Sequence, residues 1–230
     1  MGIPLFISPG LISTMTDVIN GRKRGRPLAF DRDDALARAM EVFWAAGYEG
    51  ASIPLLTQAM GISAQSLYAA FTSKDALYRE AIERYRNTAG GFGTRALEAE
   101  ADALDAVARL LHDAAITFSQ NPATPGCMIT MAPAGTADEP LVRFGRALRA
   151  EATRQVAERL ARGVDSGQVR ADTDCAAWAH YVAGVVQGLS VQARDAIPAP
   201  VLMETARIAA RALDAIRADK PGRGRGGARG

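Results

Sequence analysis

The chain has 230 residues, 48% of them hydrophobic, and carries a formal net charge of +2 at pH 7. A chain of this length and composition buries a hydrophobic core and forms one or two domains. Eight of its 27 lysines and arginines lie in two short stretches, residues 22–26 and 220–229, which leaves 19 bases against 25 acids in the rest of the chain. A mildly acidic body of this kind argues against a protein that coats nucleic acid with its whole surface.

The two cysteines, Cys127 and Cys175, do not have the spacing of a zinc site or a redox pair. We therefore expect no metal, no cofactor and no disulfide, and a reduced, cytoplasmic setting. Residues 1–14 are apolar but lack a basic leader and contain two prolines, so they do not resemble a secretory signal. Whether the natural start is Met1 or Met15 stays open. No segment of the sequence has the length and hydrophobicity of a membrane span.

The first helix is expected at residues 32–46. Four apolar side chains recur there at the spacing of one helical face, namely Leu36, Met40, Phe43 and Trp44. Asp31 is expected to cap the first turn. Gly47 is expected to end the helix, because glycine adopts the left-handed conformation after a helix without a steric penalty.

Three further helices are expected close behind the first. They run from Ser52 to Met60, over about residues 64–70, and from Ser73 to about Arg86, with Ser52, Ser63 and Ser73 as their N-caps. Gly61 is expected to make the turn between the first two of these helices. Two short helices joined in this way are typical of a helix-turn-helix, whose second helix lies in the major groove of DNA.

Beyond residue 86 the pattern remains helical. Residues 89–93 contain three glycines and predict a break between two regions. Helices are expected at residues 101–119, 140–163, 174–193 and 200–218, with an irregular, proline-rich stretch at 121–139. No β-alternation of useful length occurs. The predicted fold class is all-α, with an N-terminal three-helix helix-turn-helix domain followed by a C-terminal helical domain.

This pattern divides the chain into four expected parts. Residues 1–27 form a disordered N-terminal extension with a basic arm, and residues 28–86 form the DNA-binding domain with its connecting helix. Residues 87–219 form a helical effector-binding and dimerisation domain, and residues 220–230 form a disordered basic tail.

The residues at the start of the second motif helix are expected to reach base edges. They are Ala64, Gln65 and Ser66, and the amide of Gln65 has the geometry for a bidentate contact with adenine. Tyr68 and Lys74 are expected to contact phosphates. The complete set of expected contacts with double-stranded operator DNA is Arg22, Lys23, Arg24, Arg26, Ser52, Ala64, Gln65, Ser66, Tyr68 and Lys74.

The basic arm has two interpretations. The run Arg24-Gly25-Arg26-Pro27 resembles the core of an AT-hook, which inserts arginines into narrow minor grooves. The alternative is an ordinary solvated basic tail. Its position beside the helix-turn-helix favours contact with DNA.

One longer pattern resembles a known family. The residues Tyr68-x-x-Phe71-x-Ser73-Lys74-x-x-Leu77, after Gly61-Ile62-Ser63 and after Ala39-x-x-x-Phe43-x-x-x-Gly47-Tyr48, resemble the TetR family of bacterial transcriptional regulators. The resemblance covers residues 32–86. Thr57 departs from it, because the family usually has alanine there. The resemblance implies a three-helix DNA-binding domain, a divergent helical domain that binds ligand and dimerises, and repression released by a small molecule.

Candidates for contact with a small, largely apolar effector are one histidine and several aromatic and sulfur-containing side chains of the second region, although packing in the core explains each equally well. They are His112, Phe118, Cys127, Met128, Met131, Trp178 and Tyr181. The expected homodimer interface draws on the apolar faces of residues 174–193 and 200–218. Its candidates are Val182, Val185, Val186, Leu189, Leu202, Ala209 and Leu213.

Two alternatives remain beside a repressor released by an effector. One is a dimeric DNA-binding regulator that responds to no effector. The other is an enzyme on a helical scaffold, although no nucleophile, base or metal cluster occurs at a usable spacing.

Overall fold

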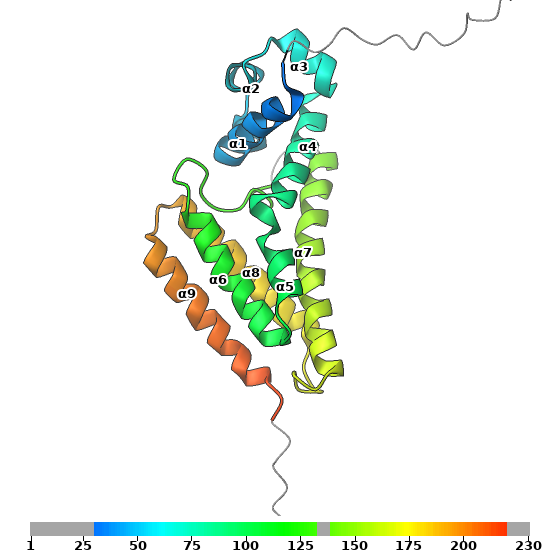
Figure 1. Cartoon of the computed structure of the whole chain (residues 1–230), viewed down its shortest axis with the longest axis vertical. Coiled ribbons are helices and arrows are strands. Elements are labelled where there is room, and N and C mark those ends of the chain that lie inside the picture. The colour runs from blue at the N-terminus through cyan, green and yellow to red at the C-terminus, as the bar shows by residue number, and fades with distance from the viewer. Residues whose placement is uncertain (1–29, 133–138, 220–230) are drawn as a thin grey trace, which may run out of the picture.

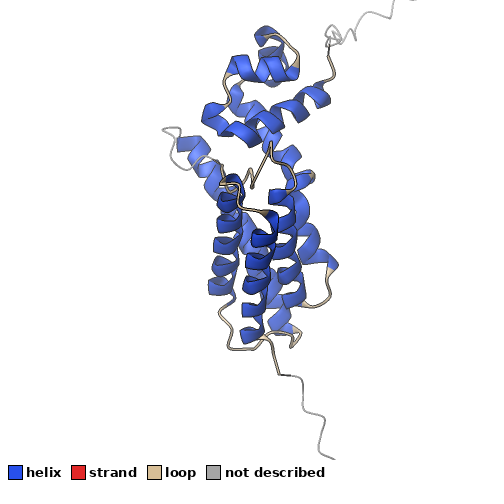
Figure 2. Ribbon diagram, turned by 90° about the vertical axis from the view of Figure 1, so that its left-hand side faces the viewer, coloured by secondary structure: helices blue, strands red, loops and turns tan. Residues whose placement is uncertain are grey.

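A computed structural model of the chain describes residues 30–132 and 139–219. Within these ranges the regular structure is helical, apart from an isolated bridge between Val169 and Arg217 (Figure 2). The all-α prediction is therefore confirmed. The basic arm, residues 22–26, and the basic tail, residues 220–230, lie outside the described residues.

The first four helices form a compact group at one end of the molecule (Figure 1). They are α1(Arg32–Gly50), α2(Ile53–Met60), α3(Ala64–Phe71) and α4(Lys74–Asn87). The predicted caps are present: the side chains of Asp31, Ser52, Ser63 and Ser73 each accept backbone amide hydrogen bonds at the start of a helix. Gly47 has a φ of 70° and breaks α1, so the regular part of that helix ends where the sequence predicts.

The remaining helices form a bundle into which α4 leads. They are α5(Phe92–Ala99), α6(Ala103–Ser119), α7(Glu139–Asp165), α8(Cys175–Arg194) and α9(Ala199–Ala212), with short 3₁₀ turns η1(Ala89–Gly91) and η2(Leu213–Ile216). Figure 1 shows α7 running alongside α4 and α5, with α6 and α9 on the other side of the bundle, and α8 packs against α6, α7 and α9. The described part of the proline-rich stretch, residues 121–132, contains turns and no helix, as predicted.

The glycine-rich break is only partly what the sequence predicts. Residues 89–91 form a 3₁₀ turn, but α5 begins immediately afterwards at Phe92 and includes Gly93. Phe92, Ala96 and Leu97 are buried, and α5 packs on α6. Burial of this apolar face therefore outweighs the low helix propensity of glycine.

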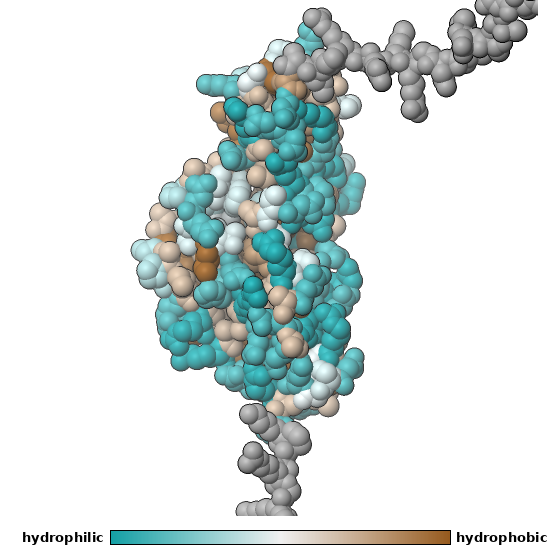
Figure 3. Space-filling view, viewed as in Figure 1, coloured by the Kyte–Doolittle hydropathy of each residue, from teal (hydrophilic) through white to brown (hydrophobic). Residues whose placement is uncertain are grey.

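The core extends through both groups of helices. The apolar residues that recur at helical spacing along α6 are all buried, namely Leu104, Val107, Leu111, Ala115 and Phe118. The face of the molecule seen in Figure 3 is mostly hydrophilic with scattered apolar side chains. In the described ranges, none of the helices combines the length and hydrophobicity that a bilayer crossing requires.

Candidate DNA interface and ligand cavity

The helix-turn-helix comprises α2 and α3. Leu56 and Leu67 are fully buried, which fixes the two helices against each other and against the group. Gly61 joins them with a φ of 68°, a left-handed conformation that suits glycine. Thr57, the departure from the family pattern, donates its hydroxyl to the carbonyl of Ile53 at 2.9 Å. Its polar group is thus satisfied inside α2.

The N-terminal part of α3 presents the predicted base-contacting face. Ala64 and Gln65 are exposed, and the Tyr68 side chain is 48% exposed. Ser66 is half-buried, and its Oγ lies 3.0 Å from the Oγ of Ser63. Gln65 and Tyr68 are therefore free to meet DNA, whereas Ser66 already takes part in the helix cap.

Ser52 is the N-cap of α2, and Lys74 is the first residue of α4. Ser52 is exposed, and its Oγ accepts the amide of Leu55. Lys74 is half-buried, and burial lowers the pKa of its ammonium, an effect that Glu49 opposes. Both residues lie at helix N-termini, where backbone amides also attract phosphate groups.

A cavity of about 480 Å³ lies in the second group of helices. Its walls come from α4, the η1–α5 region, α6, α7, α8 and the connection after α6. Its large apolar lining residues are Phe92, Leu97, Leu110, Ile129, Leu148, Val156, Val182 and Val186. A cavity of this size accommodates a small organic molecule.

Polar side chains accompany this apolar lining. Arg86 and Glu83 of α4 form an ion pair at 3.1 Å. Arg149 of α7 donates to the carbonyl of Ala132 at 3.1 Å, which ties the connection after α6 to α7. Glu151 also lines the cavity, and its hydrogen bonds with Arg154 hold the pKa of its carboxyl below the usual value.

Cys127 is the one predicted effector residue that lines this cavity. It is buried, and the Tyr85 hydroxyl donates to its Sγ at 3.6 Å. Burial raises the pKa of Tyr85, so this phenol is a donor at neutral pH. Cys127 therefore combines a cavity position with a contact to α4.

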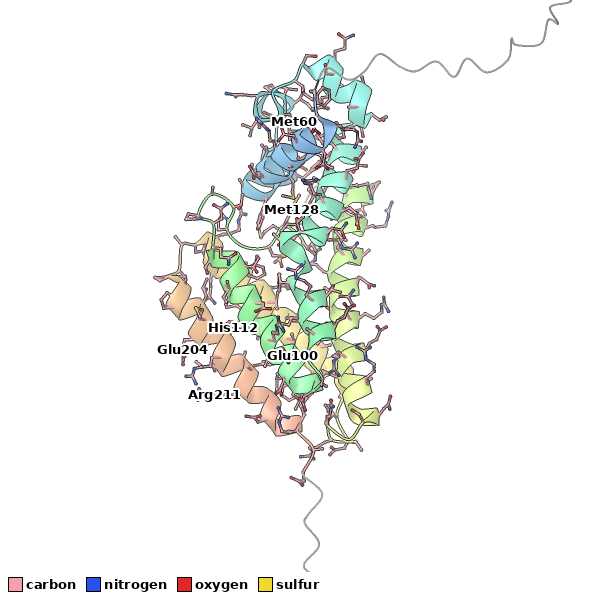
Figure 4. The ribbon with its side chains drawn as sticks, viewed as in Figure 1. Met60, Glu100, His112, Met128, Glu204 and Arg211 are labelled. Atoms are coloured by element: carbon pink, nitrogen blue, oxygen red, sulfur yellow. The ribbon has the colours of Figure 1, made fainter. Side chains whose placement is uncertain are left out.

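The other predicted effector residues lie elsewhere, because their helices turn them toward the core or the surface. Met128 is buried near the junction of the two groups, and His112 is exposed on α6 (Figure 4). Phe118 is buried against Phe92, and Met131 is 41% exposed. Trp178 and Tyr181 pack against each other on α8, outside the cavity.

A shallow apolar groove follows α8 and α9. Its lining includes Tyr181, Gly184, Val185, Gly188, Leu189, Ile208 and Ala209. A Cβ built on Gly184 or Gly188 meets nothing within 4 Å, so these glycines leave open space. Nothing in the described chain fills it.

The predicted interface residues divide between the groove and the interior. Val185, Leu189 and Ala209 line the groove, whereas Val182 and Val186 line the cavity. Leu202 and Leu213 are buried within one chain. Leu202 belongs to α9 and Leu213 to η2, and because both elements pack on α6, these two leucines have no surface left for a second chain.

The described residues contain no group of three His, Cys, Asp or Glu side chains suited to a metal ion. His112 instead lies 3.4 Å from Asp113 on the surface of α6.

Comparisons with known proteins agree with this geometry. The model of a family described as bacterial regulatory proteins, tetR family, matches residues 35–81. The HTH-type transcriptional repressor ComR of Escherichia coli K12 is 30% identical over 192 residues, which cover 80% of this chain and 90% of ComR.

Solved structures extend the similarity over both groups of helices. A cysteine-substituted variant of the TetR family regulator CifR, complexed with 26-bp double-strand operator DNA, is 43% identical with a TM-score of 0.77. The match covers 81% of this chain and 99% of that one. A TetR-type regulator from Rhodococcus sp. RHA1 is 36% identical with a TM-score of 0.56, and the match covers 82% of this chain and all of that one.

Proposed function

Because the chain belongs to the TetR family of bacterial transcriptional regulators, and is therefore a DNA-binding regulator and not an enzyme, we propose that it is a homodimeric repressor. It binds a pseudo-palindromic operator and leaves it when a small molecule enters the cavity beside Cys127. The observation that carries this proposal is that α4 connects an exposed recognition helix, α3, to a mainly apolar cavity in the second group of helices.

The assignment of α3 as the reading helix rests on exposure and packing. Leu67 and Phe71 bury one face of α3, while Gln65 and Tyr68 stand on the other. Helix-turn-helix proteins read bases from the N-terminal part of this helix. The basic arm at residues 22–26 adds contacts with phosphates or the minor groove in this proposal.

The homodimer is proposed to form through the groove on α8 and α9. Val201, Met203 and Ile208 of α9 are 39–53% exposed, an unusual concentration of large apolar side chains. Gly184 and Gly188 leave room for close approach by a helix of a second copy. Two copies joined here place two α3 helices on successive half-sites of an operator.

The effector proposed for the cavity is small and mainly apolar. Eight large aliphatic or aromatic side chains line the space, and Arg86, Arg149 and Glu151 supply polar groups that orient a ligand. A ligand that binds more tightly when the α3 helices are wrongly spaced weakens operator binding by the same factor.

The test begins with DNA from upstream of the protein's own gene. Tight binding that resists random competitor DNA and falls steeply with salt supports an operator-reading dimer. That complex is then exposed to a panel of small aliphatic and aromatic compounds. Release by a compound that also raises the melting temperature of the free protein supports the effector site. Binding no tighter than to random DNA contradicts the operator assignment for that sequence.

A further inference from the structure

The connection after α6 passes beneath α1 (Figure 1), and its residues 126–127 join α1 to α8 through hydrogen bonds. The indole Nε1 of Trp44 donates to the carbonyl of Gly126 at 3.1 Å in a buried position. The amide of Cys127 donates to the Oγ of Ser190, on α8, at 2.8 Å. Two consecutive residues of this connection are thus bonded to the DNA-binding helices on one side and to the proposed dimer helix on the other.

A second contact joins α1 and α8 directly. The guanidinium of Arg194, in the last turn of α8, donates to the carbonyls of Trp44 at 3.2 Å and Ala45 at 3.0 Å. These carbonyls belong to the last regular turn of α1 before Gly47, at the negative end of its helix dipole. Arg194 therefore caps α1 from another part of the chain.

The backbone of the connection after α6 has little conformational freedom at Gly126. Gly126 has a φ of 75°, and a Cβ there would lie 2.7 Å from the carbonyl oxygen of Ser190. A displacement of residues 126–127 must consequently also move Trp44, Ser190 or both.

The same segment forms part of the cavity wall. Cys127 and Ile129 line the cavity, and Tyr85 contacts both Cys127 and Trp44, its ring centroid lying 4.8 Å from that of Trp44. An occupant of the cavity therefore meets the residues that hold α1.

We propose that Trp44 and Arg194 are positioning residues that fix the DNA-binding helices relative to α8, and that a cavity occupant acts on them by displacing residues 126–127. If α8 is held by the dimer interface, the orientation of α1 on α8 sets the separation of the two α3 helices. The part played by the occupant rests on the function proposed above, whereas the positioning role does not.

The first experiment needs no effector. A duplex is selected from a random library with the wild-type protein, and binding of each variant to it is compared with binding to a scrambled duplex. We expect Arg194→Met to weaken binding to the selected duplex by about fivefold or more, and to the scrambled duplex by much less. Methionine keeps the aliphatic stem that packs beside Gly126 but removes both donors.

Two variants separate positioning from simple packing. Arg194→Lys restores a cationic donor and is expected to recover much of the lost affinity, and Trp44→Phe keeps a ring but loses the bond to Gly126 and is expected to resemble Arg194→Met. Arg170→Met is the matched control, because it removes one exposed arginine whose ion pair is with Asp172. If Arg194→Met and Trp44→Phe both bind the selected duplex as the wild type does, the positioning role is wrong.

A cavity-filling variant tests the connection with the effector site. Ala152 of α7 lines the cavity and has no role in the contacts above. Ala152→Trp is expected to weaken binding to the selected duplex, and to have much less additional effect when combined with Arg194→Met. If Ala152→Trp weakens binding by the same factor in the wild type and in Arg194→Met, Arg194 does not transmit the effect of the cavity. Normal binding by Ala152→Trp together with weak binding by Arg194→Met would contradict release by a cavity occupant and uphold the positioning role.

Discussion

The ammonium nitrogen of Lys74 lies 4.3 Å from the centroid of the Tyr48 ring. Lys74 is the first residue of α4, where the positive end of the helix dipole disfavours a cation. The ring face of Tyr48 offsets that repulsion and holds the side chain near the end of α1. The predicted phosphate contact thus starts from a side chain whose position is already restricted.

Lys74→Ala is expected to weaken binding to all DNA sequences alike. It should also make the dependence of affinity on salt less steep, by the amount that corresponds to about one phosphate contact. The measurement is the slope of log affinity against log salt for operator and random duplexes. Tyr48→Leu keeps the charge but removes the ring, so its salt slope should stay close to that of the wild type. A changed base preference in Lys74→Ala would contradict the phosphate assignment.

Gln65→Ala is expected to relax base preference, because Gln65 is exposed at the start of α3. Loss of a bidentate amide contact costs about 1–3 kcal/mol of discrimination at one base pair. Binding to a set of singly substituted operators measures this effect. Equal loss of affinity for specific and random DNA would rule out base reading, and Tyr68→Phe provides the comparison expected to weaken both.

Ile208→Glu is expected to dissociate the proposed homodimer, because this side chain is 53% exposed and lines the α8–α9 groove. A charge placed there must be desolvated in the interface. Sedimentation velocity should show monomers and should coincide with weakened operator binding. Met131→Glu is the control, since Met131 is 41% exposed but lies outside the groove; a dimer that survives Ile208→Glu would place the interface elsewhere.

The buried side chain of Tyr85 is expected to make the stability of the folded state sensitive to alkaline pH. Burial raises its pKa above the ordinary value of 10.0, so the folded state retains a proton that the unfolded chain loses. The stability from this group is therefore complete below about pH 10 and declines as pH rises further. Tyr85→Phe should lose less stability than the wild type over that range in urea unfolding. If Tyr85→Phe shows the same pH dependence of unfolding as the wild type, the alkaline sensitivity does not come from Tyr85.

Substitution of Arg159, which lies away from the DNA interface, is expected to reduce the stability of the fold strongly. Arg159 is buried, and its guanidinium donates to the carbonyls of Leu97, Glu100 and Ala101 at the end of α5. Arg159→Met removes its hydrogen bonds to all three carbonyls, of which only that of Ala101 keeps a second donor, Gln168 at 3.2 Å. This loss should cost about 2–4 kcal/mol in unfolding free energy.

The control for Arg159→Met lies on the same helix. Arg154 is exposed and pairs with Glu151 and Glu158. Arg154→Met should change the unfolding free energy by about 0.5 kcal/mol or less, because exposed ion pairs contribute little. Similar losses in both variants would mean that the buried carbonyls do not depend on Arg159.

The helices and caps of the DNA-binding domain were predictable because their signals are local. Asp31, Ser52, Ser63 and Ser73 cap helices from positions adjacent to them in the chain, and Gly61 makes its turn with its own dihedral angles. The helix α5 was not predicted, because its stability comes from burial against α6 and not from its glycine-containing sequence.

The candidate cavity was less predictable. Apolar periodicity identifies residues that leave water, but it does not distinguish a core position such as Phe118 from a cavity wall such as Val182. The side chains that accompany Cys127 in the cavity come from five helices, and their convergence has no counterpart in sequence spacing.

By itself the sequence determined the all-α class, the helix-turn-helix and the family, since these follow from periodicity, capping and a motif within about fifty adjacent residues. Only the tertiary structure decided which residues enclose the cavity and that Arg194 caps α1. Trp44 and Arg194 are 150 positions apart in the chain. Contacts at such separation depend on how helices pack, which local propensity does not encode.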